Sequence, residues 1–137
     1  IAWITPLRDG LNLVAKEYVA AQGLREDDAG VLLLSEFAGA SVELKYALLT
    51  NPYDRQSLKE GLIQALKMES AERRLRMKRL FDSVKYYNIN FWSEEFLQEI
   101  ENIRTWAFAD DGTAETEWQK GYDSAKAMVR ALLHANA

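Results

Sequence analysis

Short apolar runs alternate with helical patterns in the first half of the chain. Three runs rich in Ile, Val and Leu have the length of strands and show no polar alternation: Ile1–Thr5, Val31–Ser35 and Ala47–Thr50. Between them, the spacing of apolar residues predicts a helix over Asn12–Gln22 and a shorter one around Ala40–Tyr46. Apolar strands that alternate with helices are typical of a parallel sheet buried on both faces, with right-handed crossovers. We therefore predict an α/β fold.

The second half of the chain is predicted to be helical. Asp54 or Ser57 can cap a first helix, and Ser57 with Glu60 fits a capping box. Ser70 opens a second helix and Asn90 caps a third, with one more helix near the end of the chain. The apolar residues predicted to face inward recur at helical spacing: Leu58, Leu62, Ala65 and Leu66, then Met77, Leu80, Phe81 and Val84, then Trp92, Phe96, Ile100 and Ile103, then Trp118, Tyr122, Ala125, Val129 and Leu132.

The predicted sheet is narrow for a parallel sheet. Three strands leave both edges open, whereas sheets usually have about four to six strands. The sequence also begins at Ile1, inside the first predicted strand and without a start methionine. We therefore expect further strands upstream, and expect this chain to be the C-terminal part of a larger fold.

The composition excludes several classes of site. The 137 residues suffice for one domain with a core. With no cysteine there is no disulfide framework and no thiolate metal site, and the single His134 disfavours a histidine zinc site or a histidine triad. A net charge of −4 disfavours nucleic acid and anionic membranes as partners. No apolar run approaches the ~20 residues of a membrane span, so we expect a soluble, cytoplasmic protein.

The segment Thr5–Glu17 carries the most informative chemistry. It combines a strand end, a tight turn at Asp9-Gly10 and a helix start, and open α/β folds bind ligands at the carboxyl ends of strands. Amides at the helix start would form an anion site suited to phosphate, and Gly10 would let a ligand approach the backbone. Glu17 could accept hydrogen bonds from a vicinal diol such as that of ribose, and Asp9 could hold sugar hydroxyls. The amides in question belong to Leu11, Asn12, Leu13 and Val14.

The same residues also have a purely structural interpretation. Asp9 and Asn12 are good N-cap residues, and Gly10 is a common turn residue. Glu17, next to Lys16, fits a solvated helix surface. One pair of acidic residues at this spacing does not decide between the two interpretations.

Four runs of the sequence carry a family resemblance: Thr5–Ala20, Val31–Ala40, Ala47–Asp54 and Asn88–Leu97. In order and spacing they closely resemble the trehalose-6-phosphate synthase family, which also contains glucosylglycerol-phosphate synthase. Members are retaining glycosyltransferases with two facing Rossmann-like domains, the GT-B architecture. The resemblance implies that residues 1–101 are the C-terminal part of the donor-binding domain, including its crossover helix. Residues 102–137, which match no motif of the family, would form a helical C-terminal extension.

The resemblance implies a role for each residue of the segment from Asp9 to Glu17. Asp9 would contact hydroxyls of the donor glucose and is the expected catalytic residue, while Glu17 would bind the ribose hydroxyls. Backbone amides would hold the glucose and the diphosphate; they belong to Gly10, Leu11, Asn12, Leu13 and Val14. No metal or cofactor is implied. The family's phosphate-binding Arg and Lys and its acceptor pocket lie outside this sequence, in the missing N-terminal part of the same enzyme.

The resemblance implies glucose transfer from a nucleotide-sugar donor to a phosphorylated acceptor. Leu11 and Trp3 resemble glucosylglycerol-phosphate synthases, which use ADP-glucose and sn-glycerol 3-phosphate in osmolyte synthesis. The alternative is trehalose-phosphate synthesis from UDP-glucose and glucose 6-phosphate. An alternative of another class is a non-catalytic nucleotide-binding module. The oligomeric state is not predicted.

Three further features are interpreted without a ligand. The basic cluster Arg73–Arg79 is expected to be a solvated helix face, because Met77 and Leu80 already supply the buried side of that helix. The turn Ser35–Ala40 lies at the same sheet edge as the Asp9 turn, and no ligand contact is assigned to it. Trp92 and Phe96 are expected to be core residues.

Overall fold

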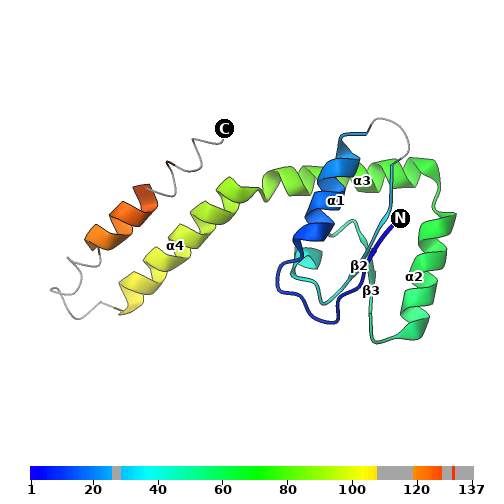
Figure 1. Cartoon of the computed structure of the whole chain (residues 1–137), viewed down its shortest axis with the longest axis horizontal. Helices are drawn as coiled ribbons and strands as arrows, with labels where there is room; N and C mark the ends of the chain where they lie inside the picture. The colour runs from blue at the N-terminus through cyan, green and yellow to red at the C-terminus, as the bar shows by residue number, and fades with distance from the viewer. Residues whose placement is uncertain (26–28, 108–118, 128–130, 132–137) are drawn as a thin grey trace. The chain divides into compact units, whose positions relative to one another are not determined.

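The computed structural model describes residues 1–25, 29–107, 119–127 and 131. The chain forms two compact units, Ile1–Tyr86 and Tyr87–Ala137. The first contains the sheet and the second is helical (Figure 1). The elements in chain order are β1 (Ala2–Ile4), α1 (Leu13–Gly23), β2 (Leu32–Ser35), the 3-10 helix η1 (Gly39–Val42), β3 (Leu48–Thr50), α2 (Arg55–Lys67), α3 (Ser70–Tyr86) and α4 (Ile89–Ala107).

The sheet confirms the predicted α/β fold. Its three strands are parallel in the order β1-β2-β3, with Ala2 opposite Leu32 and Leu33 opposite Leu48. Each strand lies within the apolar run that predicted it. The helix predicted around Ala40–Tyr46 is instead the single short turn η1, which is closed by the buried Leu44.

Helices cover both faces of the sheet, as continuous apolar strands require. Leu32 and Leu34 belong to a cluster with residues of α1 and α3, whereas Leu33 belongs to a second cluster with Ala65 of α2. In Figure 1, α2 and α1 accordingly flank the strands on opposite sides. All four residues of β2 are buried. The two outer strands form open edges in this chain, and Trp3 of β1 keeps 49% of its surface exposed.

Of the predicted helix caps, Asp54 is confirmed for α2, whereas the Ser57–Glu60 capping box and the Asn90 cap are wrong. Asp54 caps α2 by accepting the N–H of Gln56 at 2.8 Å, whereas the Ser57 hydroxyl lies 3.1 Å from that of Thr50 and accepts the N–H of Asn51. The capping box therefore does not form. At the start of α4 the cap is Asn88, not the predicted Asn90, because its side-chain oxygen accepts the N–H groups of residues 90 and 91 at 2.9 and 3.1 Å.

The helical unit corrects the expectation that Trp92 and Phe96 are core residues. Their rings stack on each other at 5.2 Å, but 55% and 52% of their surfaces are exposed in this chain. The end of the unit packs on α4 through Tyr122, which is buried with its hydroxyl 3.0 Å from the carbonyl oxygen of Leu97. Ala125 is exposed. Trp118, Val129, Leu132 and His134 lie outside the described residues.

Candidate functional site

The carboxylate of Asp9 organises the segment that follows β1. One oxygen accepts the N–H groups of Leu11 and Asn12 at 3.1 and 2.9 Å, and the other accepts the side-chain amide of Asn12 at 2.8 Å. The hydrogen bond from the Leu11 backbone, followed by that from the Asn12 side chain, lowers the pKa of Asp9 below its ordinary value, because both favour the charged form. Asp9 is therefore an ionised, fixed group at the carboxyl edge of the sheet.

Asn12 starts helix α1 from an uncommon backbone conformation. Its φ of 60° and ψ of 74° lie in the left-handed region, which Asn tolerates better than most residues. The side-chain oxygen of Asn12 accepts the N–H of Ala15 at 3.0 Å and so caps the helix. The structural interpretation of Asn12 as a cap is thus confirmed. The same side chain also joins the helix start to Asp9.

Part of the predicted anion site is free for a ligand. The N–H groups of Leu11 and Asn12 are occupied by Asp9, so the prediction that all four amides are free is wrong for these two. Within the part of the chain that the structure describes, no acceptor binds the N–H groups of Gly10, Leu13 or Val14. Helix N-termini attract anions through such amides and the helix dipole. Two amides of the first turn of α1 can therefore hold phosphate.

Glu17 lies one helical turn beyond these amides. Residues four apart share a helix face, so Glu17 follows Leu13 by about 6 Å along the axis of α1. Its side chain is exposed, and no ion pair or hydrogen bond involves it among the described residues. The neighbouring Lys16 instead forms an ion pair with Glu43. The Glu17 carboxylate is thus available to a ligand that already contacts the start of the helix.

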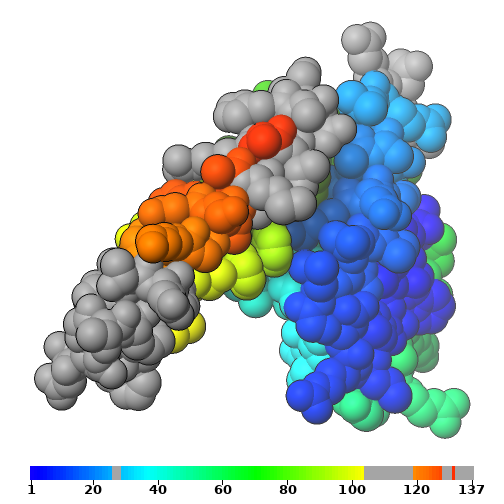
Figure 2. Space-filling view, turned by 60° about the vertical axis from the view of Figure 1, so that its left-hand side comes forward, coloured from blue at the N-terminus to red at the C-terminus, as the bar shows by residue number. Residues whose placement is uncertain are grey.

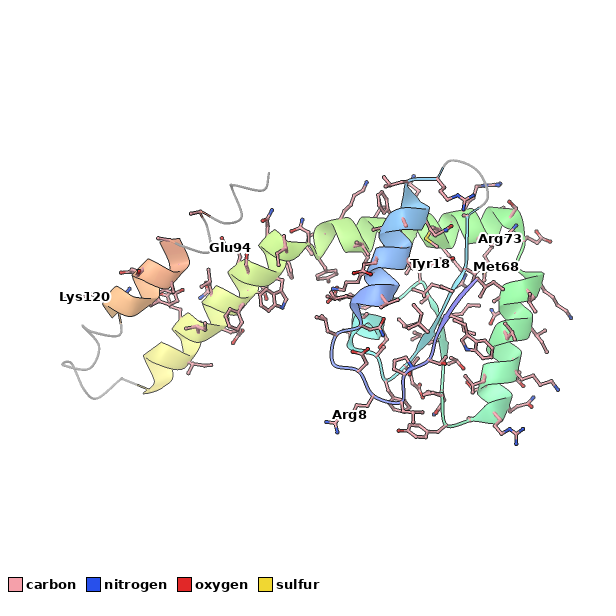
Figure 3. All side chains as sticks on the ribbon, in the orientation of Figure 1. Arg8, Tyr18, Met68, Arg73, Glu94 and Lys120 are labelled. Carbon is pink, nitrogen blue, oxygen red and sulfur yellow. The ribbon has the colours of Figure 1, made fainter. Side chains whose placement is uncertain are left out.

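Apolar side chains surround the free amides. Leu13 and Val14 keep 55% and 61% of their surfaces exposed, and Leu7 and Leu11 are also exposed. Arg8 extends away from this segment in Figure 3 and contributes no contact to it. Several exposed apolar residues beside a polar site are typical of a surface that a ligand or another part of a protein covers.

Two neighbouring turns contact this segment. The turn Ser35–Ala40 is predicted at this sheet edge without a ligand contact, and nothing in the sequence singles out Tyr53. Gly39, after β2, donates its N–H to the carbonyl oxygen of Asp9 at 2.7 Å. Tyr53, after β3, donates its hydroxyl to the carbonyl oxygen of Leu7 at 3.4 Å. Both residues lie in runs that carry the family resemblance, and that resemblance was the one feature of the sequence that could have pointed to them. Figure 2 shows the blue surface of the chain start against the cyan surface of the turn after β2.

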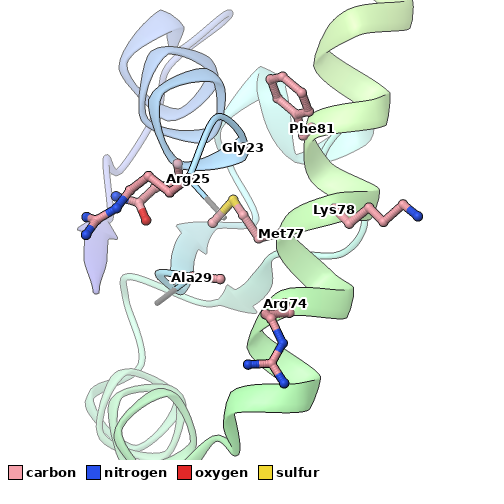
Figure 4. A pocket seen from close by; sticks show the side chains of 8 residues that line it. Gly23, Arg25, Ala29, Arg74, Met77, Lys78 and Phe81 are labelled. Atoms are coloured by element: carbon pink, nitrogen blue, oxygen red, sulfur yellow. The ribbon is translucent and has the colours of Figure 1, made fainter. Parts of the chain in front are cut away.

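A second concave site lies at the opposite edge of the sheet, between the end of α1 and α3. It is a hollow of about 260 Å³ with Met77 and Phe81 on its apolar side. Its cationic side chains, those of Arg25, Arg74 and Lys78, point in three different directions in Figure 4. Because the charges diverge, the hollow is poorly suited to a phosphate, and the exposed residues of the basic cluster fit the expected solvated helix face.

The described residues present neither a metal site nor a membrane span. No group of three or more His, Cys, Asp or Glu side chains within them could hold a metal ion. None of the helices seen in the structure is both long and apolar enough to cross a membrane.

Comparison with known proteins identifies the family to which the site belongs. Residues 1–102 match the profile of glycosyltransferase family 20. The glucosylglycerol-phosphate synthase of Pseudomonas anguilliseptica is 58% identical over 100 residues, which are 73% of this chain and 13% of the relative. The trehalose-6-phosphate synthase of Cronobacter sakazakii is 50% identical over 103 residues, 75% of this chain and 21% of the relative. The chain thus spans about a fifth or less of these relatives.

A solved structure has the same fold. It is described as trehalose-6-phosphate from E. coli bound with UDP-2-fluoro glucose, and it superposes with a TM-score of 0.62 at 48% identity. The superposition covers 72% of this chain and 22% of that chain. At this identity the likeness extends beyond the fold to the sequence.

Proposed function

The chain belongs to glycosyltransferase family 20, and from that premise we propose that the intact protein is a retaining glucosyltransferase whose donor site includes Asp9–Glu17. The observation that carries the proposal is one arrangement at the carboxyl edge of the sheet. The free amides of Leu13 and Val14 lie one helical turn from the unpaired carboxylate of Glu17, and the ionised Asp9 lies at the other end. A nucleotide sugar has hydroxyls, a diphosphate and more hydroxyls in that order.

In this assignment each group meets one part of the donor. Asp9 accepts hydrogen bonds from the glucose, the amides of Leu13 and Val14 donate to the diphosphate, and Glu17 accepts hydrogen bonds from the ribose. The amides of Leu11 and Asn12 contact the glucose or diphosphate only if Asp9 releases them, while Gly10 is already free. The exposed apolar residues beside the amides would then be covered by the donor or by the rest of the protein.

The proposed reaction needs no nucleophile from the protein. The acceptor hydroxyl attacks the anomeric carbon from the face that the nucleoside diphosphate leaves, so that the configuration is retained. The bond to the acceptor oxygen forms as the bond to the diphosphate breaks, and a phosphate oxygen takes the acceptor proton. Rate enhancement then comes from positioning and from stabilising the charge that builds on the diphosphate. The start of α1 supplies part of that stabilisation, and no cofactor is needed.

The preferred reaction is glucosylglycerol-phosphate synthesis from ADP-glucose and sn-glycerol 3-phosphate. The higher identity to a glucosylglycerol-phosphate synthase, 58% against 50% for a trehalose-6-phosphate synthase, supports it. So does the resemblance carried by Leu11 and Trp3. Trehalose-phosphate synthesis from UDP-glucose and glucose 6-phosphate is the second candidate, supported by the structure bound with UDP-2-fluoro glucose.

The test is an assay of the intact protein with each donor and each acceptor, four combinations in all. We expect nucleoside diphosphate release with ADP-glucose and sn-glycerol 3-phosphate, and a product of retained configuration by NMR. Turnover with glucose 6-phosphate alone would overturn the preferred reaction but leave the glycosyltransferase assignment. Nucleotide binding without turnover in any combination would favour a non-catalytic module.

A further inference from the structure

The turn after β2 holds both backbone groups of Asp9. The N–H of Asp9 donates to the carbonyl oxygen of Phe37 at 3.3 Å, and the N–H of Gly39 donates to the carbonyl oxygen of Asp9 at 2.7 Å. Together they form a parallel bridge between Asp9 and Ala38, beyond the ends of the two strands. Asp9, which is expected to contact the donor glucose, is therefore held by the turn after β2 as well as by contacts within its own loop.

Gly39 is packed too closely against the donor segment to carry a side chain. A Cβ atom on Gly39 would overlap the carbonyl oxygen of Gly10 and lie 2.6 Å from the carbonyl carbon. The φ of Gly39 is not positive, so any residue could adopt its backbone conformation. The requirement for glycine is thus one of space. Because the opposing atoms are backbone, they cannot rotate away as a side chain would.

The turn after β3 supports the same arrangement from the other side. The ring of Phe37 meets the ring of Tyr53 edge-on at 5.6 Å, and the Tyr53 hydroxyl donates to the carbonyl oxygen of Leu7. The N–H of Phe37 itself donates to the buried hydroxyl of Ser35 at 3.1 Å. The segment from Leu7 to Gly10 is therefore held by the turns that follow both other strands.

We propose that Gly39 is a positioning residue of the donor site, which sets Asp9 and Gly10 against the sugar end of the nucleotide sugar. The inference rests on the proposed function. It predicts an effect on one end of the ligand only, because Glu17 lies on α1 and no hydrogen bond or ion pair joins it to the turn after β2 among the described residues. The ribose end should keep its binding energy when Gly39 is changed.

The test compares two ligands in the Gly39→Ala variant of the intact enzyme. Titration calorimetry gives Kd for the nucleotide sugar and for the corresponding nucleoside diphosphate. Because losing a hydrogen bond to a charged group such as Asp9 weakens affinity by about tenfold or more, we expect the nucleotide sugar to bind about tenfold more weakly or worse, and the diphosphate less than about threefold more weakly. The matched control is Gly121→Ala, where an added methyl meets nothing within 4 Å; it should match the wild type.

Unchanged binding of both ligands by Gly39→Ala would overturn the inference, and so would an equal loss for both. Ser35→Ala is a second variant, in case Gly39→Ala does not fold, because it removes the acceptor of the Phe37 N–H without adding bulk. It should shift the ratio of the two affinities in the same direction by a smaller factor, and an unchanged ratio would overturn the inference. If the wild-type enzyme binds no nucleotide sugar, the proposed function fails and the inference fails with it.

Discussion

Helices α1 and α2 both follow a parallel strand, but the residues at their N-termini differ in conformation and in what they bind. Asp54 caps α2 from an ordinary extended conformation, with φ of −108° and ψ of 109°. The side chains of Ser57 and Asn51 beside it accept backbone N–H groups of the same loop, those of Asn51 and Tyr53. The α1 cap, Asn12, has a positive φ, and its side-chain amide donates a hydrogen bond to the carboxylate of Asp9.

The difference separates a structural helix start from the helix start that we propose as the donor site. Both starts satisfy the same capping rule, so capping residues alone do not distinguish them. The start of α1 additionally has an uncommon backbone conformation and several apolar residues that are about half exposed. Backbone strain of this kind concentrates at functional sites, because ligand geometry and not stability selects it.

The largest expected effect comes from removing the Asp9 carboxylate at the start of α1. Asp9→Ala should lower kcat/KM of the intact enzyme by about a hundredfold, because the glucose loses its contact and the Leu11 and Asn12 amides lose their acceptor. Steady-state kinetics measures this, with the melting temperature as a check on folding. A wild-type rate in Asp9→Ala would refute the assignment of the site to α1.

A smaller effect, on donor affinity, is expected from removing the exposed Glu17 of α1. Glu17→Ala should weaken nucleotide binding by about tenfold or somewhat more, because hydrogen bonds to charged groups are worth about 1.5–3 kcal/mol. With saturating donor, kcat should stay near the wild-type value. The matched control is Glu60→Ala on α2, and its Kd should not change. Among the described residues, the Glu60 carboxylate accepts a hydrogen bond from the Gln56 side chain alone. Equal effects of the two substitutions would argue against a ribose contact at Glu17.

The smallest effect should be confined to stability. Asp54→Ala removes the cap of α2 and should lower the free energy of unfolding by about 1 kcal/mol, with donor affinity and kcat unchanged. Denaturant titration and calorimetry on the same protein measure both quantities. If Asp54→Ala instead weakened donor binding at constant stability, the distinction between the two helix starts would be lost.

The strands and the longer helices were predictable from the sequence because their apolar residues recur at fixed spacing. Leu32 and Leu34 are buried on one face of the sheet and Leu33 on the other. A strand without polar positions predicts this burial on both faces. The same pattern failed for Trp92 and Phe96. Helical spacing identifies which face is apolar, but burial depends on what covers that face, and more than half of each side chain is exposed here.

Local capping and contacts between loops were harder to predict. Asn88 and Asn90 are equally good caps by residue type, and only the backbone path selects Asn88. The use of Asp9 as an acceptor for the next amides depends on the turn geometry. The packing of Gly39 on Gly10 joins residues from two loops, and no pattern within either loop encodes that distance.

A structure of the intact enzyme with an unreactive nucleotide-sugar analogue would locate every proposed donor contact. We predict diphosphate oxygens within hydrogen-bonding distance of the Leu13 and Val14 amides, with ribose hydroxyls on Glu17 and glucose hydroxyls on Asp9. A nucleotide bound elsewhere, for example in the hollow beside Met77 and Phe81, or bound with Glu17 still free in solvent, would contradict this prediction.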